Sequence, residues 1–283
     1  MEDLARYRVA ILSFAYPDGY VAMRDIKLDV MSGEFIGILG SNGSGKTTLL
    51  KIMDGLLRDF KGVVSLDGAD IRKLIPKEIY RKVGLIFQNP DDQLFASTVG
   101  EDVAFGPINM GFPERDVSER VKKALADVDM EGFLGKSIHS LSFGQKKRVC
   151  IAGLLAMGHE ILLLDEPTAG LDPMGEYKMM SLLTKLNREG RVTMIMATHS
   201  VDLVPLFLDR LCILSKGRMM RAGTPEEVFT APRDLEHAKL RLPHIADLIY
   251  KLKHEDKVPF GRIPLTIGEA RREILHLLEE RHA

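Results

Sequence analysis

Apolar positions along the chain follow two periodicities. Short runs that are apolar at almost every position predict buried strands, and longer segments with apolar residues every three or four positions predict amphipathic helices. The runs that predict strands are 34–40, 83–88, 161–165, 192–198 and 211–215, with a hairpin through Gly217 into 218–221. The segments that predict helices are 46–57, 101–129 with breaks at Pro107 and Pro113, 143–157 and 173–188. Because strands and helices alternate, the pattern predicts an α/β fold with a largely parallel, buried sheet.

The pattern changes near residue 230. Beyond Ala231-Pro232-Arg233 the strand pattern ends, and 245–253 and 267–280 predict two helices joined by a Pro- and Gly-containing stretch at 258–264. We therefore divide the chain into an α/β domain, 1–230, and a C-terminal helical extension, 231–283. The last helix carries apolar residues at helical spacing, namely Ile267, Ala270, Ile274, Leu277 and Leu278. This stripe predicts packing onto the rest of the chain or onto a second copy of it.

Composition narrows the classes of function. The 283 residues suffice for one large α/β domain and an extension, and 45% apolar with 28% charged residues is ordinary for a globular protein. A net charge of −1 argues against broad nucleic-acid binding. The two cysteines, Cys150 and Cys212, are expected to be reduced core thiols. No apolar run approaches the roughly 20 residues that span a bilayer, and the acidic start does not resemble a secretory signal. If the protein drives transport, other chains must form the pathway.

A glycine-rich segment follows the first of these predicted strands and precedes a predicted helix. It reads Gly40-Ser41-Asn42-Gly43-Ser44-Gly45-Lys46-Thr47, the spacing of a phosphate-binding loop. Backbone N–H groups of 42–45 can turn toward phosphate oxygens, because glycine permits the unusual dihedrals, and the helix N-terminus adds positive potential. We expect Lys46 to reach the β- and γ-phosphates and the Thr47 hydroxyl to bind Mg²⁺.

Two carboxylates end the apolar strand 161–165. Asp165 and Glu166 should emerge at the carboxyl edge of the sheet, where open α/β sheets bind ligands. We expect Asp165 to hold Mg²⁺ and Glu166 to polarise an attacking water as general base. Upstream, Leu141-Ser142-Phe143-Gly144-Gln145 opens an amphipathic helix, whose first N–H groups and dipole favour a second anion.

The chain carries a phosphate loop, then this second anion-binding segment, then Asp-Glu. This order resembles that of the ATP-binding cassette ATPases, over about residues 5–230. The resemblance implies a P-loop NTPase fold with a largely parallel core sheet, an antiparallel β part and a helical subdomain at about 89–157. It also implies ATP and Mg²⁺ as cofactors, with two cassettes facing head to tail around ATP. Ser41, Thr47 and Phe143 depart from the family's commonest Pro, Ser and Gly, but Thr47 keeps the hydroxyl that Mg²⁺ needs.

The resemblance also assigns roles to individual residues. Gln88 would sense Mg²⁺ and the attacking water, and His199 would contact the γ-phosphate, so that Glu166, His199 and Gln88 are the catalytic candidates. The expected ATP-binding residues are Tyr16, which would stack on adenine, Gly40, Ser41, Asn42, Gly43, Ser44, Gly45, Lys46, Thr47 and Thr48. The expected Mg²⁺ ligands are Thr47, Gln88 and Asp165. The residues that would touch ATP in the opposite subunit are Ser142, Gly144, Gln145 and Asp172.

The stretch 87–107 is similar to the energy-coupling-factor importers, particularly their cobalt-transport ATPases. That similarity implies a motor subunit at the cytoplasmic face of the cell membrane, acting with a second ATPase subunit, a transmembrane coupling subunit and a membrane substrate-binding subunit. An acidic cluster, Asp91, Asp92, Glu101 and Asp102, beside Leu94 and Phe95, would suit a basic amphipathic helix. Cobalt is favoured as cargo, and the same ATPase role in a nickel, vitamin or other ABC transporter stays open, as does pairing with a related ATPase. A role on DNA or ribosomes is disfavoured by the single cassette and near-neutral charge.

Overall fold

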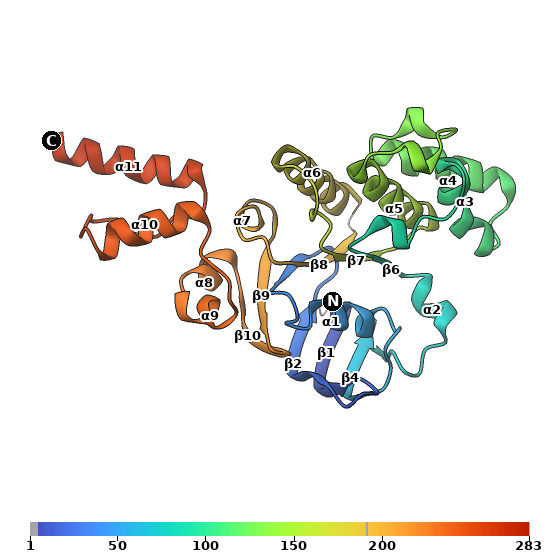
Figure 1. Ribbon diagram of the computed structural model, residues 1–283, viewed down its shortest axis with the longest axis horizontal. Coiled ribbons are helices and arrows are strands. Elements are labelled where there is room, and N and C mark those ends of the chain that lie inside the picture. The colour runs from blue at the N-terminus through green and yellow to red at the C-terminus, as the bar shows by residue number, and fades with distance from the viewer. Residues whose placement is uncertain (1–4, 191, 283) are drawn as a thin grey trace.

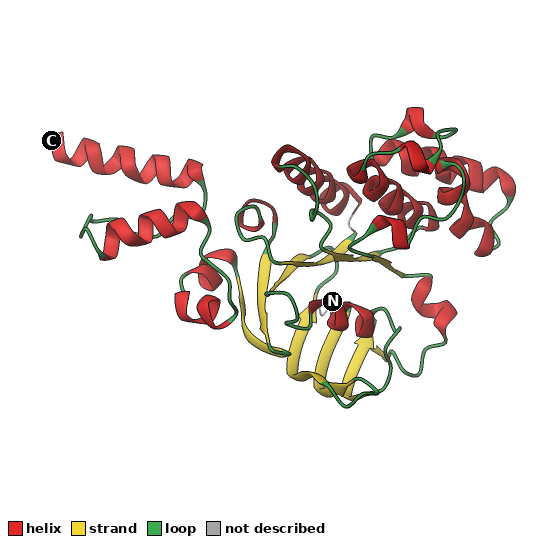
Figure 2. Cartoon of the chain, viewed as in Figure 1, coloured by secondary structure: helices red, strands yellow, loops and turns green. Residues whose placement is uncertain are grey.

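The computed structural model describes residues 5–190 and 192–282, and its strands form two sheets (Figures 1 and 2). The larger sheet has six strands in the order β10-β9-β3-β8-β7-β6, and only its edge strand β10 runs antiparallel to its neighbour. Its members are β3 (Phe35–Leu39), β6 (Val83–Ile86), β7 (Ile161–Asp165), β8 (Thr193–Thr198), β9 (Arg210–Ser215) and β10 (Arg218–Gly223). The predicted, largely parallel core sheet is confirmed.

The smaller sheet is antiparallel, with the order β2-β1-β4-β5. Its strands are β1 (Tyr7–Ala15), β2 (Val21–Val30), β4 (Phe60–Leu66) and β5 (Ala69–Asp70). This is the antiparallel β part that the family resemblance implied. Alternation along β1, where Tyr7, Val9 and Ile11 are buried and Arg8 is exposed, turns one face of this sheet toward the core.

Each central strand supplies two cores, because successive side chains point to opposite faces of a sheet. In β7, Leu162 and Leu164 pack into the cluster beneath the helices, whereas Ile161 and Leu163 pack toward the antiparallel sheet and α1 (Lys46–Met53). Strands β3, β8 and β9 divide their residues between the same two clusters. Burial on both faces explains why these strands are apolar at nearly every position.

The helical subdomain contains α3 (Val99–Asn109), α4 (Glu114–Asp127) and α5 (Phe143–Met157), and it lies beside α6 (Pro173–Gly190) in Figure 1. The predicted break at Pro107 was wrong: Pro107 lies inside α3, buried, near the end of the helix where one lost hydrogen bond costs least. Pro113 does separate the two helices, as the N-cap residue of α4. Short helices complete the domain: α2 (Pro76–Tyr80), α7 (Val204–Phe207) and α8 (Pro225–Phe229).

The helix predicted to begin at residue 46 and the strand predicted to begin at residue 83 both end earlier than predicted. The helix predicted to reach residue 57 ends at Met53, because Gly55 follows in a left-handed conformation with φ +76°. Strand β6 ends at Ile86 rather than at Gln88, so Gln88 lies in the loop beyond the sheet edge. Among residues 5–190 and 192–282, no helix has the length and apolar character to cross a membrane.

The C-terminal part begins with α9 (Pro232–His237), followed by α10 (His244–His254) and α11 (Ile267–His282), and α10 and α11 extend away from the sheets (Figure 1). Leu235, Ala238, Leu242 and Ala246 belong to the main core cluster, so packing against the α/β domain continues well past residue 230. A separate small cluster, built on Ile249, Phe260 and Ala270, joins α10 to α11. The division at 230 stays a prediction.

Candidate nucleotide-binding and hydrolysis site

The glycine-rich loop connects the end of β3 to the start of α1. Gly43 and Gly45 have φ values of +77° and +108°, the left-handed region in which residues with a Cβ are strained. Gly40 needs its lack of a side chain for a different reason: a Cβ there would lie 2.4 Å from the Ser44 hydroxyl oxygen and 2.5 Å from the Leu214 carbonyl oxygen. The Lys46 ammonium is buried and donates a 2.8 Å hydrogen bond to the Gly40 carbonyl. The loop therefore curls around its own lysine.

The carboxyl ends of β7 and β8 bring the acidic pair to this loop. The Thr47 hydroxyl donates a 2.7 Å hydrogen bond to Oδ2 of Asp165. The other carboxylate oxygen, Oδ1, is buried and has no hydrogen-bond partner among the described residues. Burial raises the pKa of Asp165, although Thr47 and Lys46 oppose that shift. A hard cation satisfies such an oxygen pair, so the Thr47 hydroxyl and the Asp165 carboxylate fit Mg²⁺.

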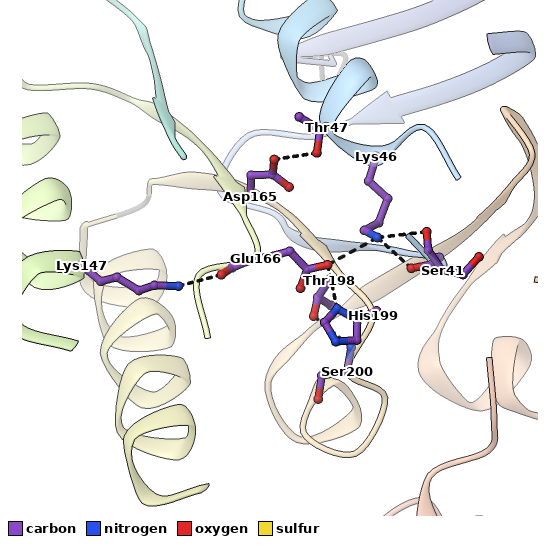
Figure 3. A network of polar contacts seen from close by, with 10 residues as sticks. Ser41, Lys46, Thr47, Lys147, Asp165, Glu166, Thr198, His199 and Ser200 are labelled. Atoms are coloured by element: carbon purple, nitrogen blue, oxygen red, sulfur yellow. Dashed lines mark hydrogen bonds and ion pairs between the residues drawn. The ribbon is translucent and has the colours of Figure 1, made fainter. Parts of the chain in front are cut away.

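The Glu166 side chain is buried between Lys46 and His199 (Figure 3). Its side chain is only 6% exposed, and Oε1 lies 2.9 Å from His199 Nδ1 and 3.4 Å from Lys46 Nζ. Its backbone N–H donates to the Ala197 carbonyl at 2.9 Å. Its φ is +50°, an uncommon value for a residue with a side chain. Strain of this kind persists only where the surroundings enforce it, and it is frequent at functional sites.

Two cavities meet at this acidic residue. One, of about 300 Å³, is lined by 42–48 together with Gln88, Asp165 and Glu166. The other, of about 890 Å³, is lined by Ser41, Glu166 and His199 and, on its far side, by residues 239–241. The structure thus brings together residues predicted from four separate segments: the phosphate loop, Gln88, the acidic pair and His199.

The aromatic residue expected to meet adenine, Tyr16, contacts the first turn of α1. The Tyr16 hydroxyl shares a 2.9 Å hydrogen bond with the Thr48 hydroxyl, and its ring packs edge-on against Phe14 with centroids 5.0 Å apart. Tyr20, which the sequence pattern did not assign, lines the smaller cavity and is 58% exposed. Both tyrosines flank the loop, and the assignment of adenine stacking to Tyr16 stays a prediction.

The residues expected to serve the opposite subunit lie away from these cavities. Ser142 and Gln145 form a reciprocal capping box at the start of α5, in which Ser142 N–H donates to Gln145 Oε1 at 2.9 Å. The first intrahelical hydrogen bond of α5 runs from the Lys146 N–H to the Ser142 carbonyl, so the earlier Gly144 N–H stays available to a ligand. Asp172 caps α6, accepting from the Gly175 N–H at 2.6 Å. Within one chain these residues do not complete the site.

Sequence reasoning missed a buried lysine next to the catalytic candidates. Lys147 is 1% exposed and donates a 2.9 Å hydrogen bond to the Glu166 carbonyl oxygen. A signal for it exists: Lys147 shares a helix face with Cys150, Ile151 and Leu154, at spacings of three, four and seven residues. A charged residue on an apolar helix face calls for a specific partner.

A phosphate loop on a parallel sheet, with an Asp-Glu pair at the carboxyl end of a nearby strand, defines a P-loop nucleoside triphosphatase. The family model described as ABC transporter matches residues 23–169. With that match and the relatives below, the chain belongs to the ABC transporter ATPases. It is an ATP-binding subunit of such a transporter and an ATP hydrolase coupled to transport.

Three comparisons extend this result. An ABC transporter ATP-binding protein of Geobacter sulfurreducens is 70% identical over 97% of this chain and 98% of its own length. The energy-coupling factor transporter ATP-binding protein EcfA of Methanocaldococcus jannaschii is 50% identical over 95% of this chain and 97% of its own. The structure of CbiO1 from Clostridium perfringens, part of the transporter complex CbiONQ, superposes with a TM-score of 0.77 at 40% identity, covering 87% of this chain and 99% of CbiO1.

A fourth match concerns assembly. A dimeric ATP-binding cassette in a post-hydrolysis state, bound to ADP and Pi, superposes with a TM-score of 0.69 at 29% identity, covering 77% of this chain and 98% of that one. The Ser142 segment lies apart from the phosphate loop of its own chain. This separation agrees with the dimeric state of that cassette.

Proposed function

We propose that this chain is the motor subunit of an energy-coupling-factor importer, in which two cassettes close on ATP and reopen after hydrolysis. The observation that carries the proposal is the position of Glu166, whose carboxylate lies between Lys46 and His199 at the mouth of the phosphate loop. Relatives at 43–50% identity that bear the energy-coupling-factor name support the transporter class.

The residues of this site divide the hydrolysis step among them. The 42–46 backbone and the Lys46 ammonium bind the phosphates, and Glu166 accepts a proton from the attacking water. His199 Nδ1 orients the Glu166 carboxylate at 2.9 Å, and Gln88 lines the cavity where the water would lie. Mg²⁺, held by the Thr47 hydroxyl and the Asp165 carboxylate, would neutralise developing charge on the phosphates.

The second half of each site comes from the other subunit. The first N–H groups of α5, at Phe143 and Gly144, have no intrahelical acceptor and lie at the positive end of the helix dipole. They suit a γ-phosphate held by the opposite phosphate loop, and Asp172 would lie near the same interface. A homodimer satisfies this arrangement, because one chain carries both halves. Binding energy realised only in the closed dimer would then drive closure.

The membrane partner would bind where α3, α5 and the 93–95 loop enclose a groove of about 410 Å³. Phe95 and Phe105 are 65% and 50% exposed and stack edge-on in this groove, with ring centroids 4.6 Å apart. Asp91 and Asp92 lie exposed beside it. Exposed aromatic rings next to carboxylates suit a helix with apolar and basic residues.

The acidic cluster is smaller than the sequence predicted. Asp102 turns inward and accepts from the N–H groups of Phe95 and Ala96 at 3.0 and 3.1 Å, and Glu101 caps its own helix through the Thr98 N–H. Leu94, which was expected to be exposed, is partly buried against the core. Asp91 and Asp92 are therefore the carboxylates left for a partner, and Asp91 already pairs with Lys146 at 2.6 Å.

The C-terminal extension would add a second contact between subunits. Ala270 is buried against α10, and Leu277 is packed with the same cluster, whereas Ile267, Ile274 and Leu278 are 77%, 39% and 49% exposed. One face of α11 thus packs within its own chain, and the other is open to the second ATPase subunit. Cobalt is the cargo we favour, on the similarity to cobalt-system ATPases.

A pull-down from gently solubilised membranes of the source cells tests the proposal. We expect to recover a transmembrane coupling subunit and a membrane substrate-binding subunit, which would place the ATPase at the cytoplasmic face of the membrane. The ligand of the substrate-binding subunit then names the cargo, whether cobalt, nickel or a vitamin. Recovery of DNA or ribosomal partners and no membrane protein would overturn the transport assignment and leave the ATPase in place.

A further inference from the structure

Lys147 is a buried cation beside the hydrolysis site with no part in the mechanism so far. Burial lowers its pKa to about 8, and the nearby Glu166 charge opposes that shift. At neutral pH the side chain therefore stays protonated although it is 1% exposed. Burying a charged lysine is costly unless specific contacts offset the lost hydration. Two such contacts are present, and both lead to the loop that carries Glu166.

The first contact is the hydrogen bond from Lys147 Nζ to the Glu166 carbonyl oxygen, 2.9 Å long and drawn in Figure 3. The same carbonyl accepts from the Ala169 N–H at 3.1 Å, which closes the turn after the strand. Glu166 has the left-handed φ of +50° at this point. Lys147 therefore holds the peptide whose orientation sets the direction of the Glu166 side chain.

The second contact runs through Phe143, one helical turn before Lys147. The Lys147 ammonium lies 5.1 Å from the centroid of the Phe143 ring, within the range of a cation–π interaction. The same ring packs on Gly170, where a Cβ would lie 2.9 Å from the ring atom Cε1. Leu171 approaches Gly144 in the same way, at 3.3 Å from a Cβ built there. The first turn of α5 and the loop 166–171 thus interlock.

We propose that Lys147 is a positioning residue for ATP hydrolysis, which ties the backbone of Glu166 to the N-terminus of α5 in the same chain. The inference deepens the proposed function and rests on its assignment of Glu166 as base and of α5 as the contact to the opposite nucleotide. When α5 engages the γ-phosphate of one site, Lys147 transmits its position to the glutamate of the other site. The two ATP sites of the dimer are then mechanically linked.

Three variants of the full chain separate positioning from packing. Lys147→Met keeps the volume and removes the donor and the charge. Lys147→Gln keeps an N–H donor that can reach toward the carbonyl. Lys122→Met, at an exposed position on α4, is the matched control for the loss of one lysine. Each is assayed for kcat, for KM and for ATP-dependent dimer formation by size-exclusion chromatography.

We expect Lys147→Met to lower kcat by about 10- to 100-fold, since small displacements of a catalytic group have effects of that size. Its KM should stay within about twofold, because phosphate binding does not involve Lys147, and it should accumulate an ATP-bound dimer. Lys147→Gln should recover at least about a third of the lost rate on the logarithmic scale, which a packing role does not predict. A wild-type kcat in Lys147→Met, or a parallel loss of ATP affinity and kcat that Lys147→Gln does not relieve, would overturn the proposal.

Two further variants keep the test decisive. If Lys147→Met fails to fold, Phe143→Leu removes the ring over the ammonium and should lower kcat by about threefold at unchanged KM, in keeping with a contact of cation–π strength; an unchanged kcat rejects the link. Glu166→Gln tests the underlying assignment. Full hydrolysis by Glu166→Gln would reject Glu166 as base, whereas an inactive Glu166→Gln beside a fully active Lys147→Met would reject the Lys147 inference alone.

Discussion

The Thr47 hydroxyl donates a 2.7 Å hydrogen bond to Oδ2 of Asp165, although 118 residues separate the two along the chain. Thr47 lies in the first turn of α1, and Asp165 is the last residue of β7. The two meet because parallel strands end at one edge of the sheet, and the phosphate loop ends at that edge as well. Their oxygens are the hard ligands that Mg²⁺ takes together with phosphate oxygens.

Thr47→Ala should therefore weaken binding of ATP in the presence of Mg²⁺ by about tenfold, the effect of about 1.4 kcal/mol, and change binding in EDTA much less. Removing the hydroxyl also leaves Asp165 Oδ2 without its donor, which should cost about 1–3 kcal/mol of stability. Thr47→Ser is the control and should bind like the wild type. Fluorescent ATP titrations with and without EDTA measure the difference, and equal losses under both conditions would contradict the metal assignment.

Glu166→Gln should bind ATP, form a stable dimer and lose turnover by at least about 100-fold, because an amide cannot accept the proton of the attacking water. The amide still fits the space between Lys46 and His199, so folding should be retained. Phosphate release and chromatography with ATP measure the two effects. Unimpaired hydrolysis would remove Glu166 from the role of base.

Charge reversal at Asp91 and Asp92 should weaken binding of the membrane partner by about tenfold or more, while ATP affinity stays unchanged. Both carboxylates lie beside the aromatic groove and far from the phosphate loop in sequence. Glu119→Lys on α4, exposed in the same subdomain, is the matched control. Co-purification with the coupling subunit measures the effect, and equal recovery of both variants would make the acidic pair an ordinary solvated loop.

The apolar stripe on the open face of α11 predicts a subunit contact. The double variant Ile274→Asp/Leu278→Asp should weaken self-association without ATP by about tenfold. The reason is that these two partly exposed apolar side chains would no longer bury surface against the second subunit. Ala270→Asp, in contrast, should destabilise the extension itself, since Ala270 is buried against α10. Analytical ultracentrifugation compares the self-association of the two variants. Unchanged association in the double variant would show that the stripe faces solvent and makes no subunit contact.

Stability should depend on pH through Asp54, whose pKa burial raises to about 7. Between about pH 4 and pH 7 the unfolded chain releases this proton before the folded chain does, so the folded state binds more protons and stability falls as pH rises. Asp54→Asn removes the buried charge and should stabilise the protein at pH 8 by about 1–3 kcal/mol, with little effect at pH 4. Urea denaturation at both pH values measures this, and an equal effect at both would exclude titration of Asp54.

Burial also governs the two cysteines. It raises the pKa of Cys150 and of Cys212 to about 12, and both are free thiols, as the sequence predicted. The reactive thiolate is therefore scarce at neutral pH in the folded protein, and neither cysteine lines the two cavities at the phosphate loop.

The sequence by itself determined the elements whose signal is local. Residues 161–165 and 143–157 form a strand and a helix with the predicted bounds, because hydrophobic periodicity reports burial directly. The phosphate loop and the acidic pair were also predictable, since their chemistry needs given residue types at a fixed spacing.

Tertiary structure decided what depends on contacts distant in sequence. Asp102 lies close to exposed carboxylates in the sequence, yet its side chain turns inward to two N–H groups. Lys147 resembles its neighbour Lys146, but the helix face buries one against Glu166 and leaves the other beside Asp91. Packing chooses among solvent, backbone and ion-pair partners for such side chains, because the cost of burying charge depends on what lies opposite in the fold.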